Sequence, residues 1–175
     1  MAKNITAKMK DLRIAFTGPE SSGKTTLSKW LSVYLSFDFV NEYAREYLSK
    51  RIDYSHYDLD KIASEQFRRN EGSGNLVIDT EMLVMKVWSE EKYKSCSSQI
   101  LKLLERQKID FYFLCKPDIP WENDPLRENP LDRDRLFMKY EENLNEQDFN
   151  YAVLKGSLEE RQKIIIETLQ TKLIR

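Results

Sequence analysis

Residues 12–31, LRIAFTGPESSGKTTLSKWL, decide the fold of this chain. They begin with a short apolar run, continue into a loop bounded by two glycines, and end in a helical pattern. The loop, Gly18 to Thr25, fits the pattern G-x-x-x-x-G-K-[ST] in full. Loops of this kind turn tightly, so that their backbone N–H groups converge on a phosphate at a helix N-terminus. The stretch therefore predicts a phosphate-binding loop between a strand and a helix.

Every residue of this loop is a candidate for binding ATP, because the backbone itself surrounds the phosphates. We expect Lys24 to reach the β- and γ-phosphates and Thr25 to offer its hydroxyl to Mg²⁺. An ordinary glycine-rich turn is the alternative, which the flanking strand and amphipathic helix disfavour. The predicted nucleotide-binding residues are Gly18, Pro19, Glu20, Ser21, Ser22, Gly23, Lys24, Thr25 and Thr26.

Short apolar segments recur along the chain with helical patterns between them. The strands that we expect cover residues 12–18, 37–40, 76–79, 109–115 and 151–156. Strands that alternate with helices and are apolar almost throughout are typical of a parallel sheet that is covered on both faces. The sequence therefore predicts an α/β fold, a three-layer P-loop NTPase sandwich with a five-stranded parallel sheet, in one domain over residues 1–175.

Two of the expected helices carry an apolar face at helical spacing. The helix after the loop places Leu27, Trp30, Leu31, Tyr34 and Leu35 on one side, and the last helix places Leu158, Ile165, Leu169 and Leu173 along one stripe. We expect both faces to pack against the sheet.

Composition excludes several classes of protein. The chain has 175 residues, and its 28 Lys and Arg nearly balance its 29 Asp and Glu, so it lacks the basic field of a nucleic-acid-binding protein. No apolar run is long enough to cross a membrane. Two cysteines make no disulfide framework. We expect a cytoplasmic protein that binds neither nucleic acid nor membrane; a homo-oligomer is left open.

Carboxylates that follow two of the strands are candidates for the chemistry. Asp79 ends the third strand, where it can hold Mg²⁺ through water or orient an attacking hydroxyl; a helix N-cap shared with Thr80 is the alternative. Glu42 follows the second strand, where it can accept a hydroxyl proton or bind a ribose. Arg45 can pair with Glu42, as on any protein surface, or hold an acceptor phosphate.

A proline-rich segment, residues 117–135, has the character of a lid. Arg127 and Arg133 can neutralise the charge of a γ-phosphoryl group in transit, or with Arg135 can form a charged helix face. Trp121 is a hinge anchor or a stacking surface. Tyr43 is a candidate for binding the acceptor, although core packing is the commoner role of such a ring.

The stretches TGPESSGKTTL, NEYAREYL, VIDT and PDIPWENDPLRENPLDRDRLF together resemble the kinase domain of the NadR-like ribosylnicotinamide kinases, a family of AAA-type P-loop proteins. The resemblance runs from about Leu12 to Arg161. It implies the phosphate loop, Glu42, Arg45, Asp79 and the lid group as site residues, and the lid group comprises Trp121, Asp124, Arg127 and Arg133.

That resemblance implies transfer of phosphate from ATP to the 5′-hydroxyl of nicotinamide riboside, giving nicotinamide mononucleotide in NAD salvage. In the bifunctional members an adenylyltransferase domain precedes the kinase, whereas this chain begins just ahead of the kinase strand and has only His56. We therefore expect no adenylyl transfer. Two alternatives stay open: a kinase of another nucleoside or nucleotide, and a regulatory ATPase without a small-molecule acceptor.

Overall fold

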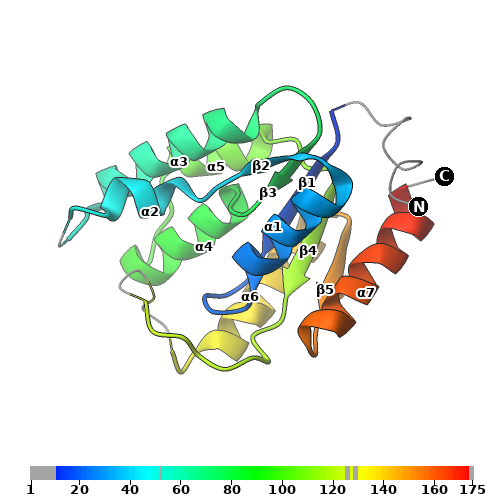
Figure 1. Cartoon of the computed structure of the whole chain (residues 1–175). Coiled ribbons are helices and arrows are strands. Elements are labelled where there is room, and N and C mark those ends of the chain that lie inside the picture. Colours follow the sequence, from blue (N-terminus) through cyan, green and yellow to red (C-terminus); the bar gives the residue numbers. More distant parts are fainter. Residues whose placement is uncertain (1–10, 52, 125–126, 128–129, 174–175) are drawn as a thin grey trace.

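The computed structural model describes residues 11–51, 53–124, 127 and 130–173, and its centre is a single sheet of five strands (Figure 1). Every pair of neighbouring strands is parallel, in the order β2-β3-β1-β4-β5. The strands are β1 Arg13–Thr17, β2 Asp38–Val40, β3 Leu76–Ile78, β4 Phe111–Cys115 and β5 Tyr151–Leu154. The predicted α/β class and the five-stranded parallel sheet are confirmed.

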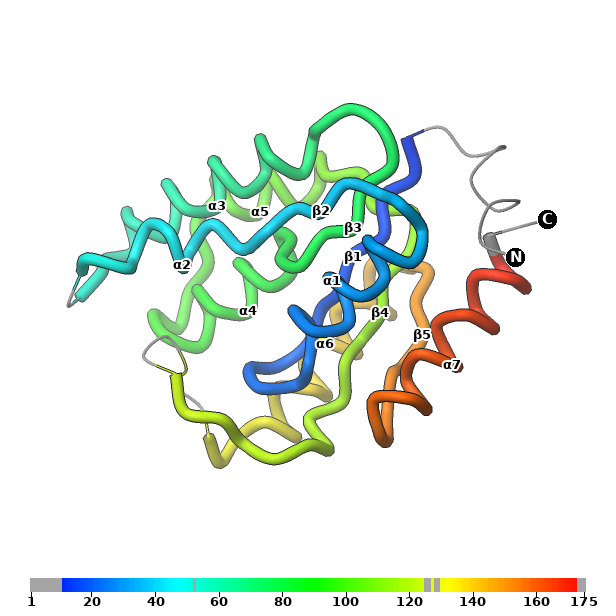
Figure 2. The backbone as a smooth tube through the Cα atoms, viewed as in Figure 1, coloured from blue at the N-terminus to red at the C-terminus, as the bar shows by residue number. Residues whose placement is uncertain are grey.

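Helices connect the strands and cover both faces of the sheet, which Figure 2 traces along the backbone. They are α1 Lys24–Leu35, α2 Tyr43–Leu48, α3 His56–Asn70, α4 Met82–Tyr93, α5 Ser98–Arg106, α6 Arg133–Glu146 and α7 Leu158–Thr168, with a π-helical turn, η3, over Leu169–Leu173. None of the described helices combines the length and the apolar composition that crossing a membrane requires.

The alternation of side chains along the central strands builds two separate cores. Ile14 and Phe16 of β1 face α1 and α7, while Ala15 faces the opposite side. In β4, Phe113 lies on the α1 and α7 side, where its ring centroid is 5.3 Å from that of Phe16. Both faces of the sheet are therefore buried beneath apolar side chains, as expected for strands that are apolar almost throughout.

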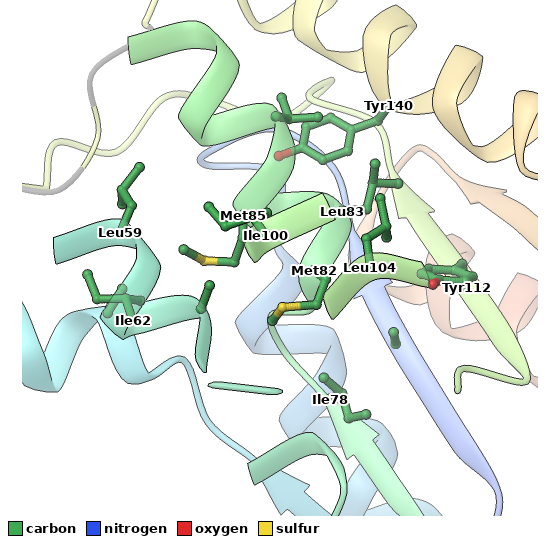
Figure 3. Close-up of a cluster of buried hydrophobic side chains, with 14 of the residues drawn as sticks. Leu59, Ile62, Ile78, Met82, Leu83, Met85, Ile100, Leu104, Tyr112 and Tyr140 are labelled. Atoms are coloured by element: carbon green, nitrogen blue, oxygen red, sulfur yellow. The ribbon is translucent and has the colours of Figure 1, made fainter. Parts of the chain in front are cut away.

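The second core lies between the sheet and helices α2 to α6 (Figure 3). Its largest fully buried side chains include Tyr112 of β4, Leu59 and Ile62 of α3 and Met82 of α4. Because α4 and α6 both pack here, this core holds these two helices in place against the sheet.

The N-termini of α3 and α1 differ in whether a side chain caps them. α3 begins with a capping box in which Ser55 and Asp58 bind each other's backbone N–H groups. At α1 the N-cap is Gly23, whose φ is 86° and which offers no side-chain cap. Backbone N–H groups at this end are therefore left available for an anion.

The apolar face predicted for α1 is confirmed, since Leu27, Leu31 and Leu35 are buried. The stripe predicted for the last helix is wrong at Leu158, which is 47% exposed. Leu158 is the first residue of α7, and it does not belong to the core that Ile165 and Leu169 join. The side chain of Leu173 lies outside the described residues.

Candidate active site

The parallel sheet brings the ends of β1, β2 and β3 to one edge, and the loop after β1 lies at its centre. Gly18 has a φ of 127°, a conformation that side-chain-bearing residues rarely adopt. A Cβ atom at Gly18 would lie 2.7 Å from the carbonyl oxygen of Cys115 in β4. Only glycine lets the loop leave β1 this close to β4.

Lys24 folds back over the loop. Its Nζ donates hydrogen bonds to the carbonyl oxygens of Gly18, at 2.8 Å, and Pro19, at 2.6 Å. The ammonium group therefore lies over the space that the loop surrounds, where it can meet a phosphate oxygen in place of these carbonyls.

Asp79 lies beside the start of α1. Its carboxylate accepts a hydrogen bond from the Thr25 hydroxyl at 2.8 Å and one from the Ser28 hydroxyl at 3.3 Å. Burial raises the pKa of Asp79 above its ordinary value. The helix-cap alternative for Asp79 and Thr80 is wrong, because the N-cap of α4 is Glu81, whose carboxylate accepts from two backbone N–H groups.

Thr25 and Asp79 suit the magnesium ion that an ATP-binding loop requires. Hydroxyl and carboxylate oxygens are the hard ligands that Mg²⁺ prefers, and Mg²⁺ usually keeps several waters and binds phosphate oxygens as well. The described residues contain no cluster of three or more His, Cys, Asp or Glu side chains that would form a closed metal cage. Such an open pair fits an ion that arrives with its nucleotide.

Glu42, Arg45 and Asp124 form a chain of ion pairs across the mouth of the site. Arg45 Nε lies 2.8 Å from a Glu42 carboxylate oxygen, and Arg45 Nη1 lies 2.7 Å from an Asp124 oxygen. Burial raises the pKa of Glu42, while the neighbouring guanidinium of Arg45 opposes that rise. The predicted pairing of Glu42 with Arg45 is confirmed, and Arg45 also reaches the lid segment.

The lid segment lies against the phosphate loop through Ser21. The Ser21 hydroxyl accepts a hydrogen bond from the Glu122 backbone N–H at 3.0 Å and one from Arg127 at 3.4 Å. Arg133 donates to the carbonyl oxygens of Ser21 and Ile119 at 2.9 and 3.1 Å. Residues 125–126 and 128–129 of the predicted lid lie outside the described residues.

A cavity of about 220 Å³ joins the loop, the carboxylates and helices α4 and α6. All nine predicted loop residues line it, as do Glu42, Arg45, Asp79 and Arg127. Apart from Trp88, an aromatic candidate for clamping a ring for which core packing is the commoner role, the sequence did not indicate the far wall. This wall is made by Val84, Val87, Trp88, Glu91, Lys92, Leu136 and Tyr140. These residues have the ordinary spacing of core helices, so nothing local distinguished them.

Four predicted residues are not among the described residues that line the cavity. Tyr43 packs with Tyr47 and under the guanidinium of Arg69. Trp121 donates from Nε1 to Asn123. Asp124 and Arg133 hold the lid segment in the contacts given above. Arg135 pairs with Asp132, as the charged-face alternative predicts, and also with Glu91 of α4.

Arg161 of α7 is a part of the site that sequence reasoning missed. It is 2% exposed, and it donates to the carbonyl oxygens of Ser22 at 2.7 Å, Gly156 at 2.9 Å and Lys116 at 2.9 Å, as well as to Asp118. In a trans peptide the C=O and the following N–H point in opposite directions. Because Arg161 holds the Ser22 carbonyl, the Gly23 N–H is directed away from Arg161.

Comparison with known proteins agrees with this architecture. A family model described as an AAA domain matches residues 13–161. No curated protein sequence matches the chain. Several solved structures share the fold. Two groups of them differ in how much of their own length this chain covers.

The first group consists of NadR structures. One, in complex with NAD and AMP-PNP, superposes with a TM-score of 0.73 at 19% identity over 94% of this chain; another, in complex with NR, gives 0.72 at 18% identity. The chain spans about half the length of these proteins, 50% and 52%.

The second group consists of shorter kinases that the fold matches along their whole length. Deoxyadenosine kinase from M. mycoides gives a TM-score of 0.64 at 14% identity, over 91% of this chain and 100% of that one. Shikimate kinase from Acinetobacter baumannii, in complex with shikimate, gives 0.56 at 16% identity, over 99% of each chain. The fold is therefore that of P-loop kinases.

We predict that Gly18→Ala abolishes nucleotide binding, because the added Cβ would collide with the Cys115 carbonyl and force the loop open. Gly74→Ala is the matched control: Gly74 also has a positive φ, 83°, but no atom lies within 4 Å of the added carbon. Calorimetric titration with ADP measures the nucleotide affinity of both variants. Equal ADP affinity in the two variants would contradict this account of the loop.

We predict that Arg161→Lys weakens ADP binding about tenfold, because lysine keeps the charge but loses the fork that holds three carbonyls. The control is Lys163→Gln, which removes a charge from the exposed face of the same helix. Calorimetric titration of folded protein, checked by circular dichroism, gives the affinities. An Arg161→Lys protein with wild-type affinity would show that the Ser22 carbonyl needs no anchor.

Proposed function

The chain belongs to the AAA domain family that this match defines, and we propose that it is an ATP-dependent kinase of a small ribosylated metabolite, nicotinamide riboside first. The observation that carries the proposal is the continuous cavity, which is lined by the phosphate loop, by the carboxylates of buried Asp79 and half-buried Glu42, and by apolar side chains of α4 and α6. A protein that only hydrolyses or senses a nucleotide has no need of the additional space along these apolar side chains.

Within this proposal the loop and Lys24 hold the β- and γ-phosphates of ATP. Lys24 exchanges its bonds to the Gly18 and Pro19 carbonyls for phosphate oxygens. Thr25 and Asp79 hold Mg²⁺, which supplies positive charge between the phosphates. Phosphoryl transfer requires mainly positioning and charge stabilisation, and these fixed groups provide both.

The acceptor hydroxyl is oriented by Glu42 or Asp79. Both carboxylates line the cavity beside the loop, and burial raises the pKa of each. A raised pKa makes a carboxylate a better proton acceptor near neutral pH. Each carboxylate already has a partner, Thr25 for Asp79 and Arg45 for Glu42, so the choice between them is left to experiment.

The segment over residues 117–135 acts as the lid, and Arg127 is its arginine nearest the reacting phosphate. Arg127 lines the cavity and contacts Ser21 of the loop. Arg133 binds backbone carbonyls instead, so we assign it the role of fastening the lid to the loop. The whole chain, 1–175, works in this proposal as one cytoplasmic kinase domain.

A nucleoside monophosphate is a poorer acceptor for this site than a nucleoside. The arginines that could grip its phosphate are already paired: Arg45 with Glu42 and Asp124, Arg51 with Asp58, and Arg68 and Arg69 with Glu65. Of these arginines, Arg45 lines the cavity, and moving it onto a phosphate would take the cation away from Glu42 and Asp124. The ion pairing therefore favours an uncharged sugar hydroxyl.

Nicotinamide riboside ranks first among nucleosides because the sequence motifs resemble the ribosylnicotinamide kinases and because a NadR structure with NR has the same fold. Deoxyadenosine kinase shares the fold as well, so other nucleosides form the second candidate.

We predict that ADP release from Mg-ATP is stimulated by nicotinamide riboside more than by common nucleosides, nucleoside monophosphates or no acceptor. Lys24→Ala should lower this rate by about a thousandfold or more with the fold intact, because it removes the cation that faces the transferring group. Lys29→Ala, an exposed lysine of the same helix, is the control. Turnover that ignores every acceptor would favour the regulatory ATPase.

The fall of kcat/KM at acidic pH tests whether Glu42 accepts the proton of the acceptor hydroxyl. If Glu42 accepts the hydroxyl proton, kcat/KM falls as the pH drops through its raised pKa. Arg45 lowers that pKa, so Arg45→Met should move the acid limb of the profile to higher pH. Arg51→Met, which removes an arginine paired with Asp58, should leave the limb in place. An Arg45→Met limb at unchanged or lower pH would argue against Glu42.

A further inference from the structure

The far wall of the cavity is apolar apart from a few polar atoms. Val84, Val87 and Trp88 come from α4, and Leu136 and Tyr140 come from α6. Figure 3 shows the Tyr140 ring projecting from α6 beside α4, with its hydroxyl at the far end. Ligand pockets of this kind bind an apolar body and use a few placed polar groups to orient it.

The other polar groups that α4 contributes to this wall are already engaged. Trp88 Nε1 donates to the Tyr54 hydroxyl at 2.9 Å. Glu91 pairs with Arg135 at 2.6 Å and with Lys139 at 2.8 Å. The Lys92 ammonium lies over the ring of Tyr54. Each of these groups therefore already has a partner within the protein.

Tyr140 differs from them. It is only 4% exposed, and its hydroxyl makes no hydrogen bond with any residue that the structure describes. Among the described residues the fully buried side-chain polar atom without a hydrogen-bond partner is the Thr17 hydroxyl, so the Tyr140 oxygen is open to the cavity that its side chain lines. A hydroxyl that lines a cavity and lacks a partner in the protein indicates a partner in the ligand.

The hydroxyl is a hydrogen-bond donor at neutral pH. Burial raises the pKa of Tyr140 well above its ordinary value, and surrounding carboxylates raise it further, namely Glu81, Glu20, Glu42 and Glu91. A neutral phenol donates to an oxygen or nitrogen acceptor. The same carboxylates disfavour an anionic group at this place, so a neutral acceptor atom is the better match.

We propose that Tyr140 is a specificity-determining residue, whose hydroxyl binds a neutral oxygen on the ring portion of the phosphate acceptor, such as the carboxamide oxygen of nicotinamide riboside. The inference rests on the proposed kinase function. With the reacting hydroxyl at Glu42 or Asp79, the heterocycle extends along Val84, Val87 and Trp88. The polar substituent of the ring then meets Tyr140 at the α6 side.

The test removes the hydroxyl and the carboxamide separately and together. Steady-state kcat/KM is measured for wild type and Tyr140→Phe, each with nicotinamide riboside and with the pyridine riboside that lacks the carboxamide. Wild type should prefer nicotinamide riboside about tenfold or more. Tyr140→Phe should lose most of that preference and should treat the pyridine riboside as wild type does.

Two controls separate binding from a structural effect. Tyr34→Phe changes a tyrosine of α1 that stacks on Trp30 and is not among the described cavity residues, so it should keep the preference. The melting temperature of Tyr140→Phe should be unchanged, because the hydroxyl is open to the cavity and holds no other described residue in place. A hydroxyl that served stability would instead lower it.

The results with the two ribosides separate failure of the Tyr140 assignment from failure of the proposed kinase function. If wild type phosphorylates nicotinamide riboside and Tyr140→Phe keeps the full preference for it, the assignment of Tyr140 is overturned and the kinase proposal stands. If wild type phosphorylates neither riboside, the proposed acceptor is wrong and the assignment of Tyr140 fails with it.

Discussion

The approach of Gly18 to the Cys115 carbonyl is the constraint on which the site depends. The contact lets the chain leave the central strand in a left-handed conformation and turn back at once into α1. As a result α1 begins at Lys24, directly at the edge of the sheet, and its N-cap, Gly23, offers no side-chain cap. The backbone N–H groups that a cap would otherwise satisfy become the phosphate site.

The parallel sheet converts this local device into a chemical site. Because all strands run the same way, Asp79 after β3 and Glu42 after β2 arrive at the edge where the loop lies. Their carboxylates lie on the side of β1 toward β3, and the lid segment after β4 crosses from the other side to contact Ser21. The cavity is thus enclosed by segments that are distant in the sequence.

What could be predicted from the sequence follows from how local each signal is. The loop, the strands and the α1 face were readable because a motif or a periodic pattern lies within a few residues. Arg161 was not readable, since a lone arginine in a charged helix looks like a surface residue until three loops converge on it. Tyr140 was not readable either, because a core tyrosine and a cavity tyrosine have the same spacing. Tyr43 shows the converse: its place in a telling motif suggested a ligand contact, yet its ring packs against Arg69.

The central claim is that the γ-phosphoryl group of ATP moves to a sugar hydroxyl. The most direct measurement is ³¹P NMR of the intact protein with Mg-ATP and nicotinamide riboside, followed over time. The account predicts a new phosphate monoester resonance that grows in equal amount with ADP, identified as nicotinamide mononucleotide by mass. Growth of inorganic phosphate with ADP, without any ester, would contradict it and would leave the loop as part of a hydrolase.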